Sequence, residues 1–227
     1  MTSSLCQQVP VLTAEEATKA LASIRSLQPL WDEDRYRLGA GISYYKPRAL
    51  YYATSKQMNP IMRKHFDWLY DRLLQALSKH YDMPVTFRDD LAVPGFNIYI
   101  GQKEFSTLQY NTHVDLQFLE LNWEPRGSAN FESTMSFTLP IAVPENGTGL
   151  NIWNVQHGEI SQDQLEESNQ LDASRAEYQQ YEVGIATIHN GKHYHQMSIS
   201  SDAKPSDARI TMQGHGLVQS GSLVIYG

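Results

Sequence analysis

Histidine and aspartate separated by one residue are the side chains of this sequence best suited to bind a metal ion. The pattern occurs three times, as His65/Asp67, His80/Asp82 and His113/Asp115. Residues two positions apart diverge on a helix but share a face on a strand. The first two pairs lie in a segment with helical periodicity, whereas residues 107–119 alternate and contain β-branched and aromatic side chains. We therefore expect only His113 and Asp115 to bind one ion together; the alternative is a buried histidine hydrogen-bonded to a turn aspartate.

Further ligands must come from the second half of the chain, which is rich in histidine. The candidates are His157, His189, His193, His195 and His215. Two histidines and one carboxylate on one face of an octahedron bind Fe(II) and leave three positions open. Arg209 has the planar guanidinium that binds a carboxylate at two points, which lysine cannot reproduce. The residues thus predict a metal site with an anion-binding arginine nearby.

Two helices are predicted before the histidine-rich half. The first spans 14–27 and begins at a capping box in which Thr13 and Glu16 satisfy each other's backbone N–H groups. The second spans 60–80, with Asn59 as the cap and Pro60 as the first helical residue. Its apolar residues recur at helical spacing, which predicts that one face packs on a sheet.

After Pro84 the pattern changes to short alternating segments separated by Gly, Pro and Asn. The predicted strands are 85–88, 95–100, 107–119, 133–140, 149–154, 184–190, 193–200, 208–212 and 222–226. Helices followed by strands at this spacing predict a mostly β protein with a jelly-roll core.

The chain has no internal repeat and no boundary that divides it into two domains, so we expect one domain over 1–227. It comprises an N-terminal helical part with an aromatic loop, 1–83, and a jelly-roll core, 84–227. Residues 161–182 break the strand rhythm, because they are polar and contain neither Gly nor Pro. We predict a helical or mobile insertion there, with a lid over the site as one hypothesis.

Aromatic and cationic side chains alternate irregularly between residues 32 and 56. Five tyrosines are interspersed with Arg35, Arg37, Lys46 and Arg48. Such a segment can line a substrate pocket, with rings for contact and cations for a carboxylate or phosphate. The other interpretation is a loop with strands laid over the core.

Composition limits the classes of function. A net charge of -7 over 227 residues argues against a protein that wraps nucleic acid. The mean hydropathy is -0.45, and no apolar run approaches the roughly 18 residues of a membrane span. Cys6 is the single cysteine, so no internal disulfide is expected. The first residues lack a basic and apolar signal segment. We expect a soluble, cytoplasmic protein.

The combined pattern resembles the Fe(II)/2-oxoglutarate-dependent oxygenases. The resemblance extends over most of the chain: two N-terminal helices, His113-x-Asp115, the glycine-containing turn 145–150, a distal histidine and Arg209-Ile210-Thr211. It implies a double-stranded β-helix, the cupin-like form of the jelly roll. It also implies Fe(II) as cofactor, 2-oxoglutarate as cosubstrate and molecular oxygen as oxidant.

The same resemblance assigns roles to residues. His195 meets the family's spacing of the distal histidine, since it lies four residues after Gly191 and 14 before Arg209. His193, which would share its strand face, and His189 stay open as alternatives. The resemblance implies His113, Asp115 and His195 as metal ligands.

The resemblance also places the cosubstrate. It implies that Arg209 binds the distal carboxylate of 2-oxoglutarate and that Thr211 adds a hydroxyl. Asn97 and Tyr99 resemble an upstream pair that contacts the cosubstrate; for both, packing in the β core is the alternative. Trp153 and Gln109 are further candidates for the pocket wall.

The implied reaction is oxidative. Family members that halogenate replace the aspartate by a small residue, so an intact Asp115 favours hydroxylation or a related desaturation or cyclisation. The expected substrate is a small polar molecule such as an amino acid or natural-product intermediate, with a peptide as the other class. Nothing in the sequence indicates an oligomeric state.

Two other functions fit parts of the pattern. A zinc hydrolase could use the same three ligands, but it lacks a nearby general-base glutamate and gives Arg209 no role. A non-catalytic cupin-like binding module could use His193 and His195, but no glutamate follows Glu182 to complete its ligand set.

Overall fold

The computed structural model describes residues 4–32, 37–42, 47–101, 112–124, 127–159, 171–198 and 204–227. The first helix, α1 (Ala14–Ser26), begins as the sequence predicts. The Thr13 hydroxyl accepts a hydrogen bond from the Glu16 N–H at 3.2 Å, and the Glu16 carboxylate accepts one from the Thr13 N–H at 3.0 Å. Ala20 and Ile24 are fully buried, so one face of α1 packs inward.

The second helix is longer than predicted. α2 runs over Arg48–Tyr81, with Pro60 inside it, so the predicted start at Pro60 is wrong. Asn59 does not cap a helix. Its amide donates to the carbonyl of Leu91 at 2.7 Å and its oxygen accepts from the N–H of Val93 at 3.0 Å. These tertiary contacts help to offset the backbone hydrogen bond that an interior proline removes.

The strands form one large and one small sheet. The large sheet contains β1 (Gln7–Pro10), β8 (Ile185–His189), β5 (Ala129–Ala142), β10 (Ala208–Gln219), β11 (Ser222–Tyr226) and β3 (Val85–Phe87) in that order, with β4 (Gly95–Ile100) beside β10 and β2 (Arg37–Leu38) beside β4. Only β11 and β3 are parallel among the described pairs of this sheet. The small sheet has the antiparallel order β7 (Glu177–Gln180), β6 (Gly149–Gln156), β9 (His193–Met197).

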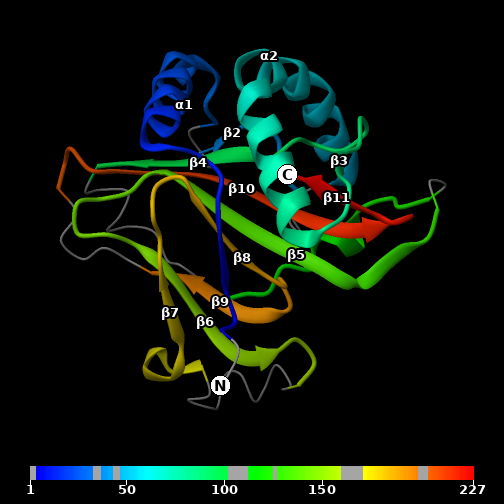
Figure 1. Ribbon diagram of the computed structural model, residues 1–227. Coiled ribbons are helices and arrows are strands. Elements are labelled where there is room, and N and C mark those ends of the chain that lie inside the picture. The colour runs from blue at the N-terminus through cyan, green and yellow to red at the C-terminus, as the bar shows by residue number, and fades with distance from the viewer. Residues whose placement is uncertain are drawn as a thin grey trace.

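Figure 1 shows the two helices on one side of the large sheet and the small sheet on the other. The predicted mostly β, jelly-roll architecture with N-terminal helices is therefore confirmed. β1, β2 and β7 were not predicted as strands. β10 extends well beyond the predicted 208–212, because the glycines within it did not end the strand.

Two predicted segments differ from the structure. Within 107–119, residues up to 111 lie outside the described part, His113 forms an isolated bridge with His195, and Gln117–Glu120 form a 3-10 helix. The predicted continuous strand is therefore wrong at its C-terminal end. Within 161–182, residues 161–170 lie outside the described part, whereas β7 occupies Glu177–Gln180. The helical or mobile interpretation is wrong for that portion, because β7 pairs with β6.

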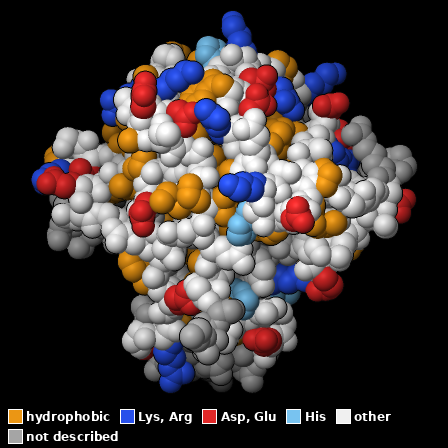
Figure 2. Space-filling view, in the orientation of Figure 1, with side chains coloured by type: hydrophobic (Ala, Val, Ile, Leu, Met, Phe, Trp, Pro, Cys, Tyr) orange, Lys and Arg blue, Asp and Glu red, His pale blue; other side chains and the backbone are white. Residues whose placement is uncertain are grey.

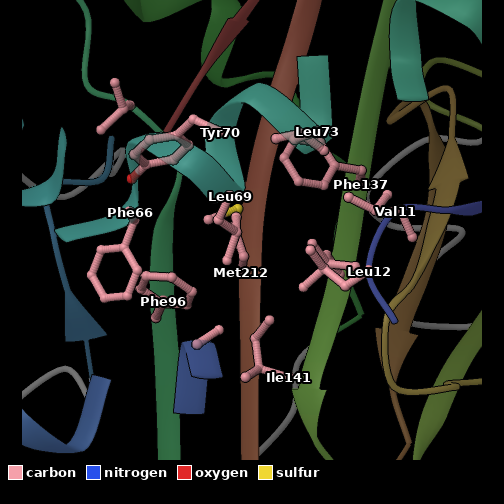
Figure 3. Close-up of a cluster of buried hydrophobic side chains, with 14 of the residues drawn as sticks. Val11, Leu12, Phe66, Leu69, Tyr70, Leu73, Phe96, Phe137, Ile141 and Met212 are labelled. Atoms are coloured by element: carbon pink, nitrogen blue, oxygen red, sulfur yellow. The ribbon is translucent and has the colours of Figure 1, made fainter. Parts of the chain in front are cut away.

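The main core lies between the helices and the large sheet. Figure 3 shows side chains from α2, β4, β5, β10 and the segment after β1 meeting there: Phe66, Leu69, Tyr70, Leu73, Phe96, Phe137, Ile141, Met212, Val11 and Leu12. Each fully buried apolar side chain of this size contributes about 1.5–3 kcal/mol. This face of the sheet supplies stability and leaves the other face for a site.

On the face shown in Figure 2, acidic and basic side chains are interspersed over the region of α1 and α2. Within the described ranges, neither helix has a stretch apolar enough to span a bilayer.

A candidate metal centre and anion pocket

His113, Asp115 and His195 meet between the two sheets. Their candidate ligand atoms all lie within 4.8 Å of one another. The His195 Nε2 is 3.3 Å from one oxygen of Asp115, and the His113 Nε2 is 3.8 Å from the other. Two ligands at right angles on a first-row metal are about 3 Å apart, given bonds of about 2.1 Å. The three side chains therefore need only small movements to bind one ion.

The backbone brings these distant residues together. His113 and His195 exchange N–H to carbonyl hydrogen bonds of 3.0 and 2.9 Å. The Asp115 N–H donates to the Gly191 carbonyl at 2.7 Å, so the turn between β8 and β9 fixes the aspartate. Gly191 has φ of +77°, and a Cβ there would lie 2.9 Å from the Ser136 hydroxyl oxygen. A glycine is thus required both by the turn and by the close approach.

The hydrogen bonds of the ligands suit metal binding. The His195 Nδ1 lies 2.9 Å from the His193 carbonyl, which can only accept, so Nδ1 carries the proton. This leaves the Nε2 lone pair of neutral His195 directed at the aspartate, as a ligand requires. The Gln117 amide donates to an oxygen of Asp115 at 3.2 Å. Both neighbours orient ligand side chains without occupying the metal side.

The electrostatics favour an ionised aspartate. Burial by itself would raise the pKa of Asp115, but the imidazoles of His195, His215 and His113 hold it well below its usual value. Burial would lower the pKa of His195, but the adjacent carboxylate outweighs burial and raises it. In the metal-free site, protonated His195 therefore supplies a positive charge beside the Asp115 carboxylate, where a metal ion would otherwise supply it.

Of the other histidines near the site, His215 has its Nδ1 3.9 Å from the Asp115 carboxylate and 3.0 Å from the Ser136 hydroxyl oxygen, whereas His193 and His189 have other polar partners. The His193 Nδ1 lies 2.9 Å from the side-chain oxygen of Asn190. The His189 Nδ1 accepts from the N–H of Gly191 at 3.2 Å, and burial lowers the pKa of His189 well below its usual value. The structure thus brings His195, rather than His193 or His189, together with the predicted pair.

A cavity of about 400 Å³ extends from the triad; we call it the central cavity. His113 is half-exposed at its edge, whereas Asp115 and His195 are buried. Alternate residues of β10 point toward it, and Arg209, Gln213 and His215 line it. Entry from the His113 side would bring a small molecule to the metal positions.

Arg209 has the most unusual environment in this cavity. Its side chain is 1% exposed, and none of its three guanidinium nitrogens has a hydrogen-bond partner among the described residues. The rings of Tyr99 and Tyr181 lie 5.6 Å from the guanidinium carbon. Aromatic faces attract a cation, and the Tyr181 hydroxyl interacts with the guanidinium, but neither tyrosine supplies the anionic partner that a buried guanidinium needs. The cavity is therefore built for an anion at this end.

The other predicted cosubstrate residues lie close by in the sheet register. Tyr99 pairs with Arg209 and Asn97 with Thr211 across β4 and β10. Asn97 and Tyr99 line the central cavity. Thr211 is fully buried with an unpartnered hydroxyl, but it is not among the described residues that line the cavity.

Gln213 and Tyr181 are two of the cavity residues that were not predicted from the sequence, whereas His215 was among the candidate ligands. Gln213 and His215 follow the alternation of Arg209 and Thr211, so the period of two would have placed both on this wall had the strand not been ended at 212. Tyr181 lies in the glutamine-rich stretch, where no pattern marks it. Burial raises its pKa although Arg209 opposes this, so Tyr181 is a neutral phenol that can donate to an anion.

Two proposed wall residues differ from expectation. Trp153 is buried, donates its indole N–H to the Asp172 carbonyl at 2.9 Å and is not among the described residues that line the cavity. It lies on β6, on the face opposite its cavity-lining neighbours. Gln109 lies outside the described residues.

No protein-family model matches the sequence, and no curated protein matches it. Solved structures do match. HygX from Streptomyces hygroscopicus, with nickel and 2-oxoglutarate bound, is 11% identical, with a TM-score of 0.57 over 96% of this chain and 84% of that one. The epimerase SnoN from nogalamycin biosynthesis, described as non-heme and α-ketoglutarate-dependent, is 11% identical, with a TM-score of 0.51 over 95% and 78%. An N-substituted L-amino acid dioxygenase from Burkholderia ambifaria AMMD is 15% identical, with a TM-score of 0.51 over 79% and 70%.

At sequence identities of 11–15%, the similarity to these structures is one of backbone fold. The mostly β architecture predicted from the resemblance to Fe(II)/2-oxoglutarate-dependent oxygenases is the one these structures share with this chain. The chain has the fold of HygX, SnoN and the N-substituted L-amino acid dioxygenase.

Proposed function

We propose that this protein is an Fe(II)/2-oxoglutarate-dependent oxygenase that hydroxylates a small polar molecule. The observation that carries the proposal is the combination of two features in one cavity. One is the His113, Asp115, His195 cluster, and the other is the buried guanidinium of Arg209 without a hydrogen-bond partner among the described residues. A metal ion bound by the cluster and a cosubstrate carboxylate bound by Arg209 would together account for both features.

The donor set fits a ferrous ion. Two imidazoles and one carboxylate on one side of a metal leave positions for a bidentate cosubstrate and oxygen. With Fe(II), 2-oxoglutarate and dioxygen bound, the site would supply oxidation of a substrate C–H bond coupled to conversion of 2-oxoglutarate to succinate and carbon dioxide.

The chain's own part is binding and orientation. Arg209 would bind the distal carboxylate of 2-oxoglutarate, and its burial strengthens that contact because water does not compete. Tyr181, which lines the cavity, would supply a hydroxyl group for the same anion; Thr211 is a second candidate donor by the family resemblance, although its buried hydroxyl does not line the cavity. Tyr99 packs against the guanidinium, and Asn97 completes the wall. The fixed tautomer of His195 and the amide of Gln117 hold the ligands in place before the metal arrives.

The size and chemistry of the central cavity support a small substrate. About 400 Å³ must hold both cosubstrate and substrate. Solved proteins with this fold include a dioxygenase of N-substituted L-amino acids and an enzyme of nogalamycin biosynthesis. We infer an amino acid derivative or natural-product intermediate as substrate, with no nucleic-acid partner, and a cytoplasmic location, since Cys6 is a free thiol.

The alternatives gain no support from the site. A zinc hydrolase needs a general base besides the ligands, and Asp115 is the one carboxylate among the described residues lining the cavity. Neither a hydrolase nor a binding module gives the buried Arg209 a partner.

The decisive experiment is spectroscopic. Purified protein loaded with Fe(II) under anaerobic conditions should develop a weak visible charge-transfer band when 2-oxoglutarate is added. Succinate is the matched control, because it has the two carboxylates but lacks the keto group that chelates the metal. A folded, iron-loaded protein without the 2-oxoglutarate band would refute the proposed function. Substrate-dependent succinate release across a metabolite panel would then identify the substrate class.

A further inference from the structure

We propose that Gln213 donates a hydrogen bond to a neutral carbonyl oxygen of the substrate, so that the central cavity contains a subsite for an amide or keto group. This inference rests on the proposed function, because it names the substrate group that the same cavity binds. Gln213 lies on β10, and its partly buried side chain lines the central cavity.

A chain of three side chains fixes the direction of the Gln213 amide. A terminal nitrogen of Arg37 donates to the side-chain oxygen of Asn97 at 3.1 Å, and the Asn97 amide nitrogen donates to the side-chain oxygen of Gln213. A guanidinium has donors and no acceptor, so only the oxygen of Asn97 can face it. Asn97 must then present its NH2 group to Gln213, which accepts with its oxygen. The NH2 group of Gln213 is consequently turned away from Asn97.

Arg37, at the start of this chain of hydrogen bonds, is held in one orientation. Its other terminal nitrogen donates to the Ala40 carbonyl at 2.9 Å. A Cβ at Gly41 would lie 2.4 Å from the guanidinium carbon, so the head group packs directly on the backbone there. A charge at one end of a hydrogen-bonded chain polarises the bonds that follow. Arg37 is therefore a positioning residue, which acts through Asn97 and makes Gln213 a stronger donor.

The other end of the chain is a donor directed at the cavity. Among the described residues, none accepts a hydrogen bond from the Gln213 Nε2. An NH2 group requires an acceptor, and an oxygen lone pair supplies one. Because the amide is uncharged, it cannot neutralise a carboxylate, and burying a charge without a partner is costly. The matching substrate group is therefore a neutral carbonyl.

The position of Gln213 separates it from the anion-binding end of the cavity. On β10 it lies four residues from Arg209, which is roughly 13 Å between Cα atoms, and only two residues from His215. The His215 Nδ1 lies 3.9 Å from the Asp115 carboxylate. A group bound at Gln213 is thus nearer to the metal ligands than to the guanidinium that we assign to 2-oxoglutarate.

The neighbouring space suits the rest of a small molecule. Arg37 and Ile42 line both the central cavity and a second cavity of about 210 Å³. Gln213 is joined to Arg37 through Asn97, so it lies on the wall of the central cavity beside the second cavity. A substrate held by its carbonyl can therefore extend toward the metal ligands on one side and into the second cavity on the other.

The test compares carbonyl compounds with their thiocarbonyl analogues, because sulfur is a weaker hydrogen-bond acceptor than oxygen. The probes are 2-piperidone, N-acetylpiperidine and N-cyclohexylacetamide, each with its thio analogue. Isothermal titration measures their dissociation constants on protein loaded with Ni(II) and 2-oxoglutarate. We expect at least one oxygen compound to bind about fivefold or more tightly than its sulfur analogue, which is the factor of one ordinary hydrogen bond.

Two substitutions at Gln213 test the donor itself. Gln213→Met removes the amide at a similar side-chain length and should bring the oxygen-to-sulfur affinity ratio close to one. Gln213→Glu keeps an oxygen that accepts from Asn97 but replaces the donor by an acceptor, so the ratio should fall to one or below. Met197→Leu, the matched control, changes another side chain that lines the cavity and should keep the ratio. Retained binding of 2-oxoglutarate shows that each variant is folded.

Equal binding of oxygen and sulfur compounds by the wild-type protein, or binding of neither, overturns the inference, as does a ratio that survives in both Gln213 variants. Weaker 2-oxoglutarate binding by Gln213→Met with an unchanged ratio also overturns it, because Gln213 would then contact the cosubstrate. If the charge-transfer band of the wild-type protein with Fe(II) and 2-oxoglutarate persists in those cases, only the subsite at Gln213 fails. If the band is absent too, the proposed function fails with it.

Discussion

Arg209 is the residue whose environment most constrains function. A guanidinium buried to 1% exposure without a hydrogen-bond partner among the described residues carries a desolvation cost that a bound anion removes. The flanking rings of Tyr99 and Tyr181 recover only part of that cost. The protein therefore retains an uncompensated charge in the free state, which is typical of a residue kept for binding.

Replacing Arg209 by methionine should weaken binding of the cosubstrate without weakening binding of the metal. We expect Arg209→Met to raise the dissociation constant of 2-oxoglutarate by about tenfold or more, since it loses a charge-assisted pair worth at least about 1.5 kcal/mol. Ni(II) affinity should remain near that of the wild type. Isothermal titration measures both constants. Thr211→Val keeps the shape of the side chain and removes only a hydroxyl, so it should weaken 2-oxoglutarate binding less than Arg209→Met does. If the 2-oxoglutarate affinity of Arg209→Met equals that of the wild type, Arg209 does not bind the cosubstrate.

Protonation of His195 should compete with the metal. The Asp115 carboxylate raises the pKa of His195 above its ordinary 6.5 in the metal-free protein, against the opposing effect of burial. The pKa of Asp115 is held well below its usual value, so the aspartate stays ionised at neutral and mildly acidic pH. Metal must therefore displace a proton from the histidine, and not from the aspartate.

Metal affinity should consequently fall as the pH decreases through the raised pKa of His195. We expect Ni(II) affinity to be constant at high pH and to weaken by about tenfold per pH unit below a midpoint that lies above 6.5, the ordinary histidine pKa. Titrations between pH 5.5 and 8.5 in a non-chelating buffer measure this. An affinity that stays flat down to pH 6 contradicts the assignment of His195 as a ligand with a raised pKa.

At the scale of elements, the turn between β8 and β9 fixes the site. Gly191 accepts the backbone hydrogen bond of Asp115 and approaches Ser136 closely, and four residues later β9 delivers His195. The mutual backbone hydrogen bonds of His113 and His195 join the same strand to the segment before Asp115. A single turn therefore controls the relative placement of all three ligands.

Gly191→Ala should damage both stability and metal binding. Its backbone lies at φ +77°, and the new Cβ would meet Ser136 at 2.9 Å and Asp115 at 3.3 Å. The matched control is Gly158→Ala, which has φ of +88° but nothing within 4 Å of the added carbon. Both variants should lose about 1 kcal/mol of unfolding free energy from backbone strain. Only Gly191→Ala should also weaken Ni(II) binding, as measured by titration; equal metal affinities for the two variants would show that the turn does not position Asp115.

For the whole molecule, the two faces of the large sheet have different tasks. One face packs against α1 and α2 in the main core (Figures 1 and 3). The other lines the cavity with the small sheet, and its residues are polar: Arg209, Gln213, His215, Ser136, Thr138 and His189. The apolar packing that stabilises the protein thus lies mainly on the face covered by the helices, whereas the face that lines the cavity carries polar groups able to bind ligands.

Ligands should therefore stabilise the fold measurably. Ni(II) and 2-oxoglutarate, each at about 100 times its dissociation constant, should each add about 2.7 kcal/mol, or about 5.4 kcal/mol together. In a chain of this size the two together correspond to an increase in melting temperature of about 10–20 °C. Scanning calorimetry should find a much smaller increase with 2-oxoglutarate alone, and a chelator should reverse the full effect. An equal increase from 2-oxoglutarate with and without metal would mean that the cosubstrate does not bind at the triad.

Local sequence patterns led to much of the candidate site. Alternation along a strand singled out the His113-x-Asp115 pair, and the resemblance to the Fe(II)/2-oxoglutarate-dependent oxygenases pointed to His195, Arg209 and Thr211. The capping box at Thr13 and most strands after Pro84 likewise follow from short-range backbone preferences.

Only the tertiary structure decided the rest, because it depends on contacts between distant segments. α2 begins at Arg48 and continues through Pro60, while Asn59 makes hydrogen bonds to the segment before β4 instead of capping a helix. β7 becomes a strand because β6 offers it an edge, and Tyr181 consequently reaches Arg209. The proximity of His195, rather than His193, to Asp115 also depends on such contacts. Both share a strand face, and it is the partner across the sheet and the turn at Gly191 that bring one of them to the carboxylate.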